Sequence, residues 1–243
     1  MTDQIQETSP QIQIILDTDD YIVINKPPNV PVDGNHLFTV EKLVPQPHKL
    51  VHQLDSPTSG ILLLAKTKKA AAAAAKEFQQ RKTAKFYLAV LHEEINQFQV
   101  DQPICDDIND FKKFKMTIGG DKQSETFIYS LFLDPDSGRQ LVLLKPITGR
   151  RHQLRVHCKF AGSSILGDKT YGQINEGERL CLHSLYLKNN AINVGLFAKI
   201  QQDDQFFEQV NCEINWSLLQ QLVEDWKQPS IDQLQDCIST KAQ

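Results

Sequence analysis

Two short segments of the sequence place charged side chains beside tight turns. The first, VHQLDSPTSG at residues 51–60, holds the carboxylate of Asp55 after a histidine and a glutamine and before Pro57 and Gly60. Its hydroxyl side chains can bond to nearby backbone and so favour a turn, and an apolar run at 61–65 follows at once. Asp55 is therefore either a residue that caps this turn or a carboxylate held still to act as a nucleophile or a base.

The second segment, TGRRHQLRVHCKFAGSSILGDKTYG at residues 148–172, is rich in cations. We expect a short helix over residues 152–160, closed by Gly162. Residues four apart on a helix share a face, so Arg151 and Arg155 would lie side by side. Two cations so placed repel each other unless an anion lies opposite. This pattern predicts either a carboxylate of the protein or a phosphate of a ligand beside the two arginines.

The charge of the chain is unevenly distributed. The formal net charge is −4, yet residues 66–85 carry seven lysines and arginines against one acid, and residues 145–159 carry five with no acid. Residues 201–243 hold eight acids against two lysines. Local potential rather than net charge attracts a polyanion, so the two basic stretches are compatible with a nucleic-acid partner. A solvated surface helix is the other interpretation of the first stretch.

Composition narrows the class of protein. The five cysteines form no CxxC pair, which argues against a disulfide framework and against a zinc site, and we expect no metal. No apolar run approaches the roughly 20 residues that span a bilayer. The first ten residues, MTDQIQETSP, lack the basic charge of targeting sequences. We therefore expect a cytoplasmic or nuclear protein without membrane contact.

Apolar periodicity and turn residues predict a strand-rich chain. The expected strands cover residues 12–16, 21–25, 61–65, 86–91, 126–133, 140–144, 180–187 and 191–199, and the expected helices cover residues 39–43, 68–80, 152–160 and 216–227. This is an α/β mixture of the α+β kind, in one domain over residues 12–243 that includes the C-terminal helix and the acidic tail. We expect residues 1–11 to be disordered.

Together the two charged segments closely resemble the signatures of the RluA-type RNA pseudouridine synthases, which isomerise uridine to pseudouridine. The first family signature is H-R-L-D followed by T-S-G, and this chain has HQLDSPTSG. The second is G-R-x-H-Q-x-R-V-H followed by G-x-x-I-L-G-D-x-x-Y-G, and this chain has GRRHQLRVH and GSSILGDKTYG. The segments DDYIVINKPPNVPV, KFYLAVL and RLCLHSLYL also resemble the family, so the likeness runs from about residue 12 to about residue 200.

The resemblance implies a fold and a set of site residues. The fold would be the pseudouridine synthase catalytic fold, a mixed and mainly antiparallel sheet with flanking helices and loops around a central cleft. Asp55 would act on the ribosyl moiety of a flipped-out uridine, Tyr87 would stack on its base, and Arg155 would pair with Asp55 and keep it ionised. The RNA would be contacted by His52, Gln53, Lys85, Arg150, Arg151 and His152. For Arg150 a structural salt bridge is the other interpretation.

The chemistry suits these residue types. A carboxylate near an anomeric carbon can stabilise or trap a positively charged sugar, and an arginine within ion-pair range lowers the pKa of an aspartate. The isomerisation breaks a C–N bond and forms a C–C bond at C5 of uracil, so it needs no cofactor and no metal. Two routes stay open, a covalent adduct with Asp55 and removal of a C2′ proton by Asp55 through a glycal.

One position departs from the family pattern. Gln53 stands where the family usually has an arginine, whose side chain fills the space that a flipped base leaves. A second function therefore stays open, that of a catalytically inactive RNA-binding or RNA-chaperone protein of the same fold. For either function the expected partner is structured RNA (tRNA, rRNA or mRNA). We expect a monomer without the S4-like domain that many relatives carry.

Overall fold

One large sheet forms the centre of the computed structural model, which describes residues 9–112, 114–172, 179–200 and 204–241. Its strands are β1 (Gln13–Asp17), β2 (Tyr21–Lys26), β3 (Lys49–Leu50), β4 (Ser59–Ala65), β5 (Ala84–Leu91), β6 (Gln99–Val100), β9 (Thr126–Leu133), β10 (Gln140–Pro146), β11 (Leu182–Asn189) and β12 (Val194–Phe197). Their order is β1-β2-β4-β11-β5-β10-β9-β6, with β3 beside β4 and β12 beside β11. Among the strands of the described residues, only β4 and β11 pair in parallel. The expected mixed and mainly antiparallel sheet is therefore confirmed.

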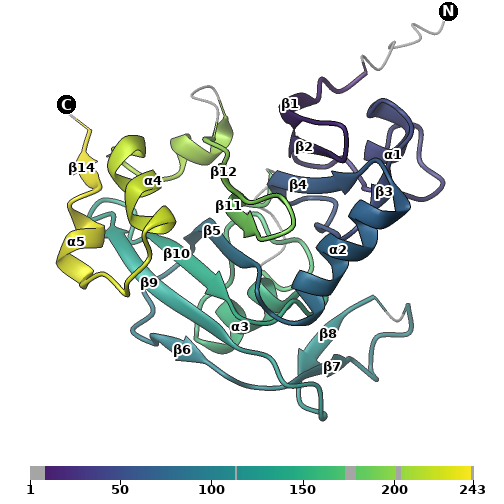
Figure 1. The fold of residues 1–243 in the computed structure, drawn as a ribbon. Coiled ribbons are helices and arrows are strands. Elements are labelled where there is room, and N and C mark those ends of the chain that lie inside the picture. Colours follow the sequence, from purple (N-terminus) through teal and green to yellow (C-terminus); the bar gives the residue numbers. More distant parts are fainter. Residues whose placement is uncertain (1–8, 113, 173–178, 201–203, 242–243) are drawn as a thin grey trace, which may run out of the picture.

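Smaller elements flank the sheet (Figure 1). Two small two-stranded sheets pair β7 (Ile104–Asp106) with β8 (Met116–Ile118) and β13 (Cys212–Ile214) with β14 (Ile238–Thr240). The helices are α1 (Val40–Leu43), α2 (Lys68–Gln79), α3 (Gln153–Phe160), α4 (Trp216–Glu224) and α5 (Ile231–Gln235), with a 3-10 turn at Gln205–Glu208. No helix of the described residues is long and apolar enough to cross a bilayer.

Several expected boundaries differ from the observed ones, each for a local reason. The helix expected to reach residue 227 ends at Glu224, because Gln228 has a φ of 55° and proline follows it. The strand expected over 191–199 begins at Val194, because the Asn189 carbonyl accepts hydrogen bonds in the turn that precedes it. β6, β7, β8, β13, β14 and α5 have two to five residues each, too few to show a period. Residues 1–8 of the segment expected to be disordered lie outside the described residues.

β4 is buried along its whole length, which explains its unbroken apolar sequence. Ile61 and Leu63 pack in one cluster with Ala70 and Ala74 of α2, while Leu62 and Leu64 belong to a second cluster on the other face. The alanines lie four residues apart and have small side chains, so α2 can pack closely against the sheet. The turn that carries Asp55 is therefore attached to the start of a strand with no freedom to slide.

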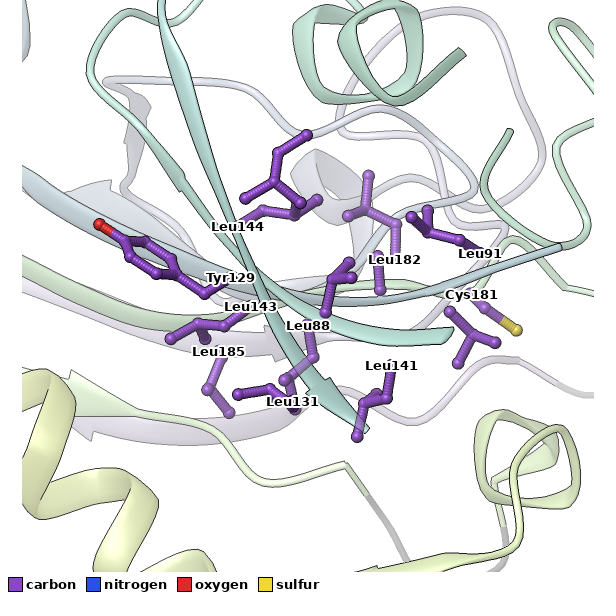
Figure 2. Close-up of a cluster of buried hydrophobic side chains, with 14 of the residues drawn as sticks. Leu88, Leu91, Tyr129, Leu131, Leu141, Leu143, Leu144, Cys181, Leu182 and Leu185 are labelled. Atoms are coloured by element: carbon purple, nitrogen blue, oxygen red, sulfur yellow. The ribbon is translucent and has the colours of Figure 1, made fainter. Parts of the chain in front are cut away.

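The largest apolar cluster joins β5, β9, β10 and β11. Figure 2 shows leucines from these strands meeting side by side, among them Leu88, Leu143 and Leu185. Helix α3 contributes Leu154 and Cys158 to the same cluster, and α4 contributes Leu219 and Val223. Because α3 is fixed by this packing, the polar residues on its first turn are held at a constant position relative to the sheet.

A close backbone contact brings the Asp55 turn against β11. In the parallel pairing Gly60 lies opposite Ser184, and in the neighbouring pairing Ser184 lies opposite Tyr87 of β5. Gly60 has a φ of +104°, and a Cβ added there would lie 2.2 Å from the Ser184 carbonyl oxygen. Only glycine permits this approach, so Gly60 sets the distance between the start of β4 and the strand beside Tyr87.

We expect Gly60→Ala to lower the free energy of unfolding by more than Gly138→Ala does. Gly138 also has a positive φ, of +72°, but its added Cβ meets no atom within 4 Å. Gly138→Ala therefore measures only the cost of placing a side chain on a left-handed backbone, which is about 1 to 3 kcal/mol. Gly60→Ala has this cost and, in addition, a clash with the Ser184 backbone. Chemical denaturation of the two variants measures the difference. Equal losses would contradict the assigned close contact.

Candidate active site

A cleft of about 660 Å³ opens where three segments of the chain meet. It is lined by the Asp55 turn, by side chains from residues 78–87 and by residues 146–155, with Leu182 beside them. All nine residues singled out from the sequence line it: His52, Gln53, Asp55, Lys85, Tyr87, Arg150, Arg151, His152 and Arg155. The structure thus collects in one place side chains that are up to 103 residues apart in the chain.

Arg155 connects two carboxylates at the bottom of this cleft. One of its terminal nitrogens donates to Oδ2 of Asp55 at 3.0 Å. Its Nε and its other terminal nitrogen donate to the two carboxylate oxygens of Asp168 at 2.8 and 2.7 Å. Burial acts to lower the pKa of Arg155, but the hydrogen bonds and charges of Asp168 and Asp55 outweigh it and raise that pKa. The guanidinium is therefore a permanent cation shared by two acids.

Asp168 was missed as a site residue in the sequence analysis, although it lies in the quoted GSSILGDKTYG segment. Its side chain is fully buried, and its Oδ1 also accepts hydrogen bonds from the backbone N–H groups of Thr170 and Tyr171. Asp168 and Asp55 are the two carboxylates beside Arg155, where the sequence predicts an anion. The signal in the sequence that could have identified Asp168 was its position directly after Gly167 in that segment.

The expectation that Arg151 and Arg155 share a helix face is wrong. Helix α3 begins at Gln153, and His152 before it has a left-handed backbone with a φ of 55°, which turns Arg151 away from the helix. Arg151 is exposed and forms an ion pair with Asp106 at 2.7 Å, next to the β7–β8 hairpin. Arg150 is also exposed, and its Nε donates to the Gln123 carbonyl at 3.2 Å. The two arginines therefore lie at the rim of the cleft.

The Asp55 turn is anchored from below by Lys26, which sequence reasoning did not single out. Lys26 is fully buried at the end of β2, and its Nζ donates to the carbonyls of Pro27, Val30 and Ser56, each at 2.9 Å. Burial lowers the pKa of Lys26 to about 7. Three carbonyls that converge on one ammonium group hold the turn to the proline-rich loop. The NKPP sequence that contains Lys26 was the available signal.

A second buried polar network supports the start of β4. The Ser59 hydroxyl accepts hydrogen bonds from the Arg179 guanidinium at 3.1 Å and contacts Nδ1 of His183 at 2.8 Å. Nε2 of His183 lies 2.8 Å from the Ala198 carbonyl, so it carries the ring proton and Nδ1 accepts from Ser59. Arg179 also pairs with Asp204. Burial lowers the pKa of His183 to about 3, so the ring is neutral.

β5 places Tyr87 and Lys85 on the wall of the cleft. The hydroxyl of Tyr87 forms a hydrogen bond with the Ser184 side chain, and burial raises the pKa of Tyr87 to about 12, so it is a neutral phenol. Nζ of Lys85 donates to the Thr148 carbonyl at 3.1 Å, and burial lowers the pKa of Lys85 to about 8. At neutral pH the wall therefore presents an uncharged aromatic ring beside a cation.

His52 and Gln53 lie on the other side of the cleft and differ in their contacts and in their exposure to solvent. Nε2 of His52 accepts the backbone N–H of Leu63 at 2.9 Å, and its ring stacks on Phe78 with a centroid distance of 4.6 Å. Burial, with the charge of Lys85 as the smaller cause, lowers the pKa of His52 to about 3. Gln53 is exposed and donates to Asp33 at 3.2 Å. His52 thus holds backbone, while the Gln53 amide faces solvent.

The assembled site presents one carboxylate to the cleft in a defined orientation. Oδ2 of Asp55 is held by Arg155, and its Oδ1 makes no hydrogen bond to the described residues. His152 contacts this region as well, with its Nε2 3.9 Å from Oδ2 of Asp55. Within the described residues no group of His, Cys, Asp and Glu side chains could hold a metal ion. The geometry suits nucleophilic or base chemistry by Oδ1 beside an aromatic ring.

Comparison with known proteins gives a consistent result. The family model described as RNA pseudouridylate synthase matches residues 20–160. The ribosomal large subunit pseudouridine synthase D of Borreliella burgdorferi is 37% identical over 163 residues, which cover 65% of this chain and 48% of that protein, so the chain spans about half of its length. The dual-specificity RNA pseudouridine synthase RluA of Vibrio vulnificus is 32% identical over 209 residues, which cover 77% of this chain and 81% of that protein.

A solved structure is similar over nearly the whole chain. The human RNA pseudouridylate synthase domain containing 1 superposes with a TM-score of 0.72 at 29% identity, covering 90% of this chain and 97% of that one. Fold and sequence comparisons therefore point to the same family.

We expect Asp168→Asn to lower the free energy of unfolding by about 3 to 5 kcal/mol, because it leaves a buried guanidinium without its fully buried partner. Asp106→Asn is the matched control, since it breaks an ion pair of Arg151 at the surface, where such pairs contribute no more than about 1 kcal/mol. Denaturant titration at neutral pH measures both. A loss for Asp168→Asn as small as that of the control would contradict the shared-cation arrangement.

We expect the stability of the protein to fall as the pH is lowered below about 6.5, in part because of His52. Its folded pKa is about 3, while an unfolded histidine has a pKa of about 6.5, so the unfolded state takes up the proton first. The contribution is complete above pH 6.5 and is lost as the pH falls toward 3. Between pH 6 and 4.5, His52→Gln should flatten the dependence by up to about 1.4 kcal/mol per pH unit.

The control for this titration is His36→Gln, since His36 is exposed. This variant tests whether the flattening comes from the loss of any histidine or from the loss of His52. A slope unchanged by His52→Gln would show that the His52 ring is protonated in the folded protein.

Proposed function

The chain belongs to the RNA pseudouridylate synthase family and is an RNA pseudouridine synthase, and we propose that it isomerises a specific uridine of a structured RNA through Asp55. The observation that carries this assignment is the carboxylate of Asp55, held by Arg155 on one oxygen and open to the cleft on the other. The Arg155 guanidinium, 3.0 Å away, holds one oxygen of Asp55 in place, and both proposed routes use the other oxygen.

The reaction is an isomerisation, and its atoms balance without a co-reactant. The C1′–N1 bond of uridine breaks, the uracil turns, C5 bonds to C1′, the C5 proton leaves to solvent, and N1 takes up a proton from solvent. Oδ1 of Asp55 either attacks C1′ and later departs, or removes the proton on C2′ and returns it. In both routes the carboxylate acts on the ribose, and an electron-deficient sugar carbon is stabilised by the negative charge beside it.

Tyr87 and the apolar walls complete the proposed site. A neutral phenol ring beside the carboxylate offers a surface on which a flipped base stacks. The strand behind the turn is fully buried, so the reacting sugar lies against a dry wall. Extrusion of the uridine costs a few kcal/mol, which must come from contacts elsewhere along the RNA.

We assign these contacts along the RNA to the cationic and amide side chains around the cleft. We assign phosphate contacts to Lys85, Arg150 and Arg151, whose positive groups lie on the wall and rim of the cleft. Gln53 is exposed at the mouth, so its amide is available to a base edge or a sugar. His52 contributes to the RNA site indirectly, because its ring accepts the backbone N–H of Leu63. The similarity to a ribosomal large subunit pseudouridine synthase supports ribosomal RNA as one substrate class, and tRNA is the second class to be tested.

A catalytically inactive protein of the same fold is not favoured. Such a protein would need no ionised carboxylate at the bottom of the cleft, and a lone buried carboxylate is costly to keep. Here Arg155 is retained as its partner, and a fully buried Asp168 is retained as the partner of Arg155. Gln53 lies apart from this pair, so its departure from the family pattern concerns RNA contacts.

We expect the wild type to release tritium from RNA labelled at C5 of uridine, and Asp55→Asn to slow that release by at least about 1,000-fold. Asparagine keeps the shape of the side chain but cannot serve as the carboxylate base or nucleophile. Separate tRNA and rRNA pools identify the substrate class, and sequencing of the product finds the uridine. Asp33→Asn is the control, because it removes an exposed carboxylate near the same cleft.

The experiment is decided by turnover, with RNA binding measured in parallel. Both Asp55→Asn and the control should bind RNA with the salt dependence typical of phosphate contacts. If the folded wild type binds RNA but releases no tritium from any pool, the assignment as an active enzyme on these RNAs is overturned. Equal release by wild type and Asp55→Asn would remove Asp55 from the chemistry.

A further inference from the structure

His152 lies against the carboxylate of Asp55 with one ring nitrogen already committed. Its side chain is only 4% exposed, yet the residue lines the cleft. Its Nδ1 is 2.7 Å from the hydroxyl of Tyr171, and its ring meets the rings of Phe114 and Tyr171 edge-on at 4.9 and 5.6 Å. The imidazole is therefore fixed on three sides, and Nε2 is the nitrogen on the side of Asp55.

The hydrogen bonds determine which nitrogen carries the proton. The Tyr171 hydroxyl accepts the backbone N–H of Met116 at 2.8 Å, so its own proton is free to be donated. We assign that proton to Nδ1 of His152, 2.7 Å away, because no other acceptor for it is found among the described residues. A neutral imidazole that accepts at Nδ1 carries its proton at Nε2. His152 thus directs an N–H group toward Asp55.

The backbone of His152 is held in an uncommon conformation. Its φ of 55° is left-handed, which non-glycine residues seldom adopt. The neighbouring Gln153 enforces it, since its amide oxygen accepts from the Thr148 hydroxyl at 2.7 Å and from the Arg150 N–H at 3.0 Å. Its amide nitrogen donates to Glu125 and Thr126. Such conformations persist where the surroundings over-determine them, and they cluster at functional sites.

The separation between His152 and Asp55 leaves a gap of definite size. Nε2 and Oδ2 are 3.9 Å apart, too far for a direct hydrogen bond. One oxygen atom can lie about 2.8 Å from both, which is the usual length of such bonds. That oxygen would have to accept from the N–H of His152 and donate to the carboxylate. A hydroxyl group does both.

The uridine itself has a hydroxyl in the required place. The 2′-OH is attached to the carbon next to C1′, and Asp55 acts on C1′ or on the proton of C2′ in either route. If Oδ1 attacks C1′, Oδ2 lies beside the 2′ oxygen, because the two oxygens of a carboxylate are about as far apart as C1′ and O2′. The 3′ and 5′ oxygens are joined to phosphate and have no proton to donate.

We propose that His152 and Asp55 together form a subsite for the 2′-hydroxyl of the target uridine. Nε2–H of His152 donates to the 2′ oxygen, and the 2′ hydroxyl proton is donated to Oδ2 of Asp55. The subsite rests on the proposed function and adds a substrate requirement to it. The 2′-OH is the group by which a protein distinguishes RNA from DNA, so the enzyme reads ribose at the reacting nucleotide itself. His152 thereby becomes a residue that selects and orients the sugar.

The test compares one RNA hairpin in two forms, built around the uridine that sequencing identifies. In one form the target is uridine, and in the other it is 2′-deoxyuridine, with tritium at C5 in both. The wild type should show a kcat/KM on the order of 10- to 100-fold higher for the ribose form, the discrimination expected for a lost buried hydrogen-bond pair. His152→Phe keeps the ring and removes the N–H, so the ratio should fall by about 10-fold.

Two further variants separate recognition from folding. Tyr171→Phe removes only the hydroxyl that fixes the imidazole proton, so the ratio should fall by less than in His152→Phe. His157→Gln changes a buried histidine of the same helix, whose Nδ1 contacts Thr126, and should leave the ratio at its wild-type value. A purely structural role for His152 would lower kcat/KM equally for both RNA forms.

The outcomes are distinct. A ratio that falls in His152→Phe and stays unchanged in His157→Gln supports the subsite. Parallel losses on both RNA forms, or a wild type that does not prefer ribose, overturn it while leaving the proposed function intact, and water alone then fills the gap. Absence of tritium release by the wild type from the ribose form would overturn the proposed function and the subsite together.

Discussion

A single buried guanidinium shared between two carboxylates fixes the position of everything else in the cleft. Arg155 is 3% exposed and Asp168 has no exposed side-chain surface, so neither charge can be left without the other. Gly167 makes the pair possible, because its φ of +74° lets the chain pass so close to Arg179 that an added Cβ would lie 2.2 Å from that carbonyl. Since Arg155 cannot move, Asp55 is oriented by it from 100 residues away.

The paired strands β4, β11 and β5 place the other residues of the cleft near Arg155 and Asp168. Gly60, Ser184 and Tyr87 lie opposite one another on β4, β11 and β5, so the start of the Asp55 turn and the aromatic ring are two strands apart. Lys26 at the end of β2 fastens the turn from the other side through three carbonyls. The apolar clusters on both faces of β4 resist any slip in register, which would move every side chain to the other face.

The sequence pattern predicted those elements that depend only on the residue types within one segment. The buried run of β4, the alanine helix α2 and the β9–β10 hairpin each follow from residue types within one segment, and the resemblance supplied Asp55 and Arg155. Asp168 and Lys26 escaped prediction because their roles exist only once distant segments meet. The start of α3 was predicted one residue early because the left-handed His152 depends on the hydrogen bonds of Gln153 to β9 and its neighbours. His52 looked like an RNA contact, while the fold uses its ring nitrogen to hold Leu63.

Sharing the guanidinium also decides how reactive Asp55 can be. A carboxylate that binds an arginine through both of its oxygens has no oxygen left for a substrate. Asp168 takes that position, with both of its oxygens bound to Arg155. Asp55 receives one hydrogen bond on one oxygen, which fixes its orientation and leaves its Oδ1 without a hydrogen bond to the described residues. In the proposed reaction, the fully buried carboxylate of Asp168 therefore leaves one oxygen of the half-buried Asp55 available to the substrate.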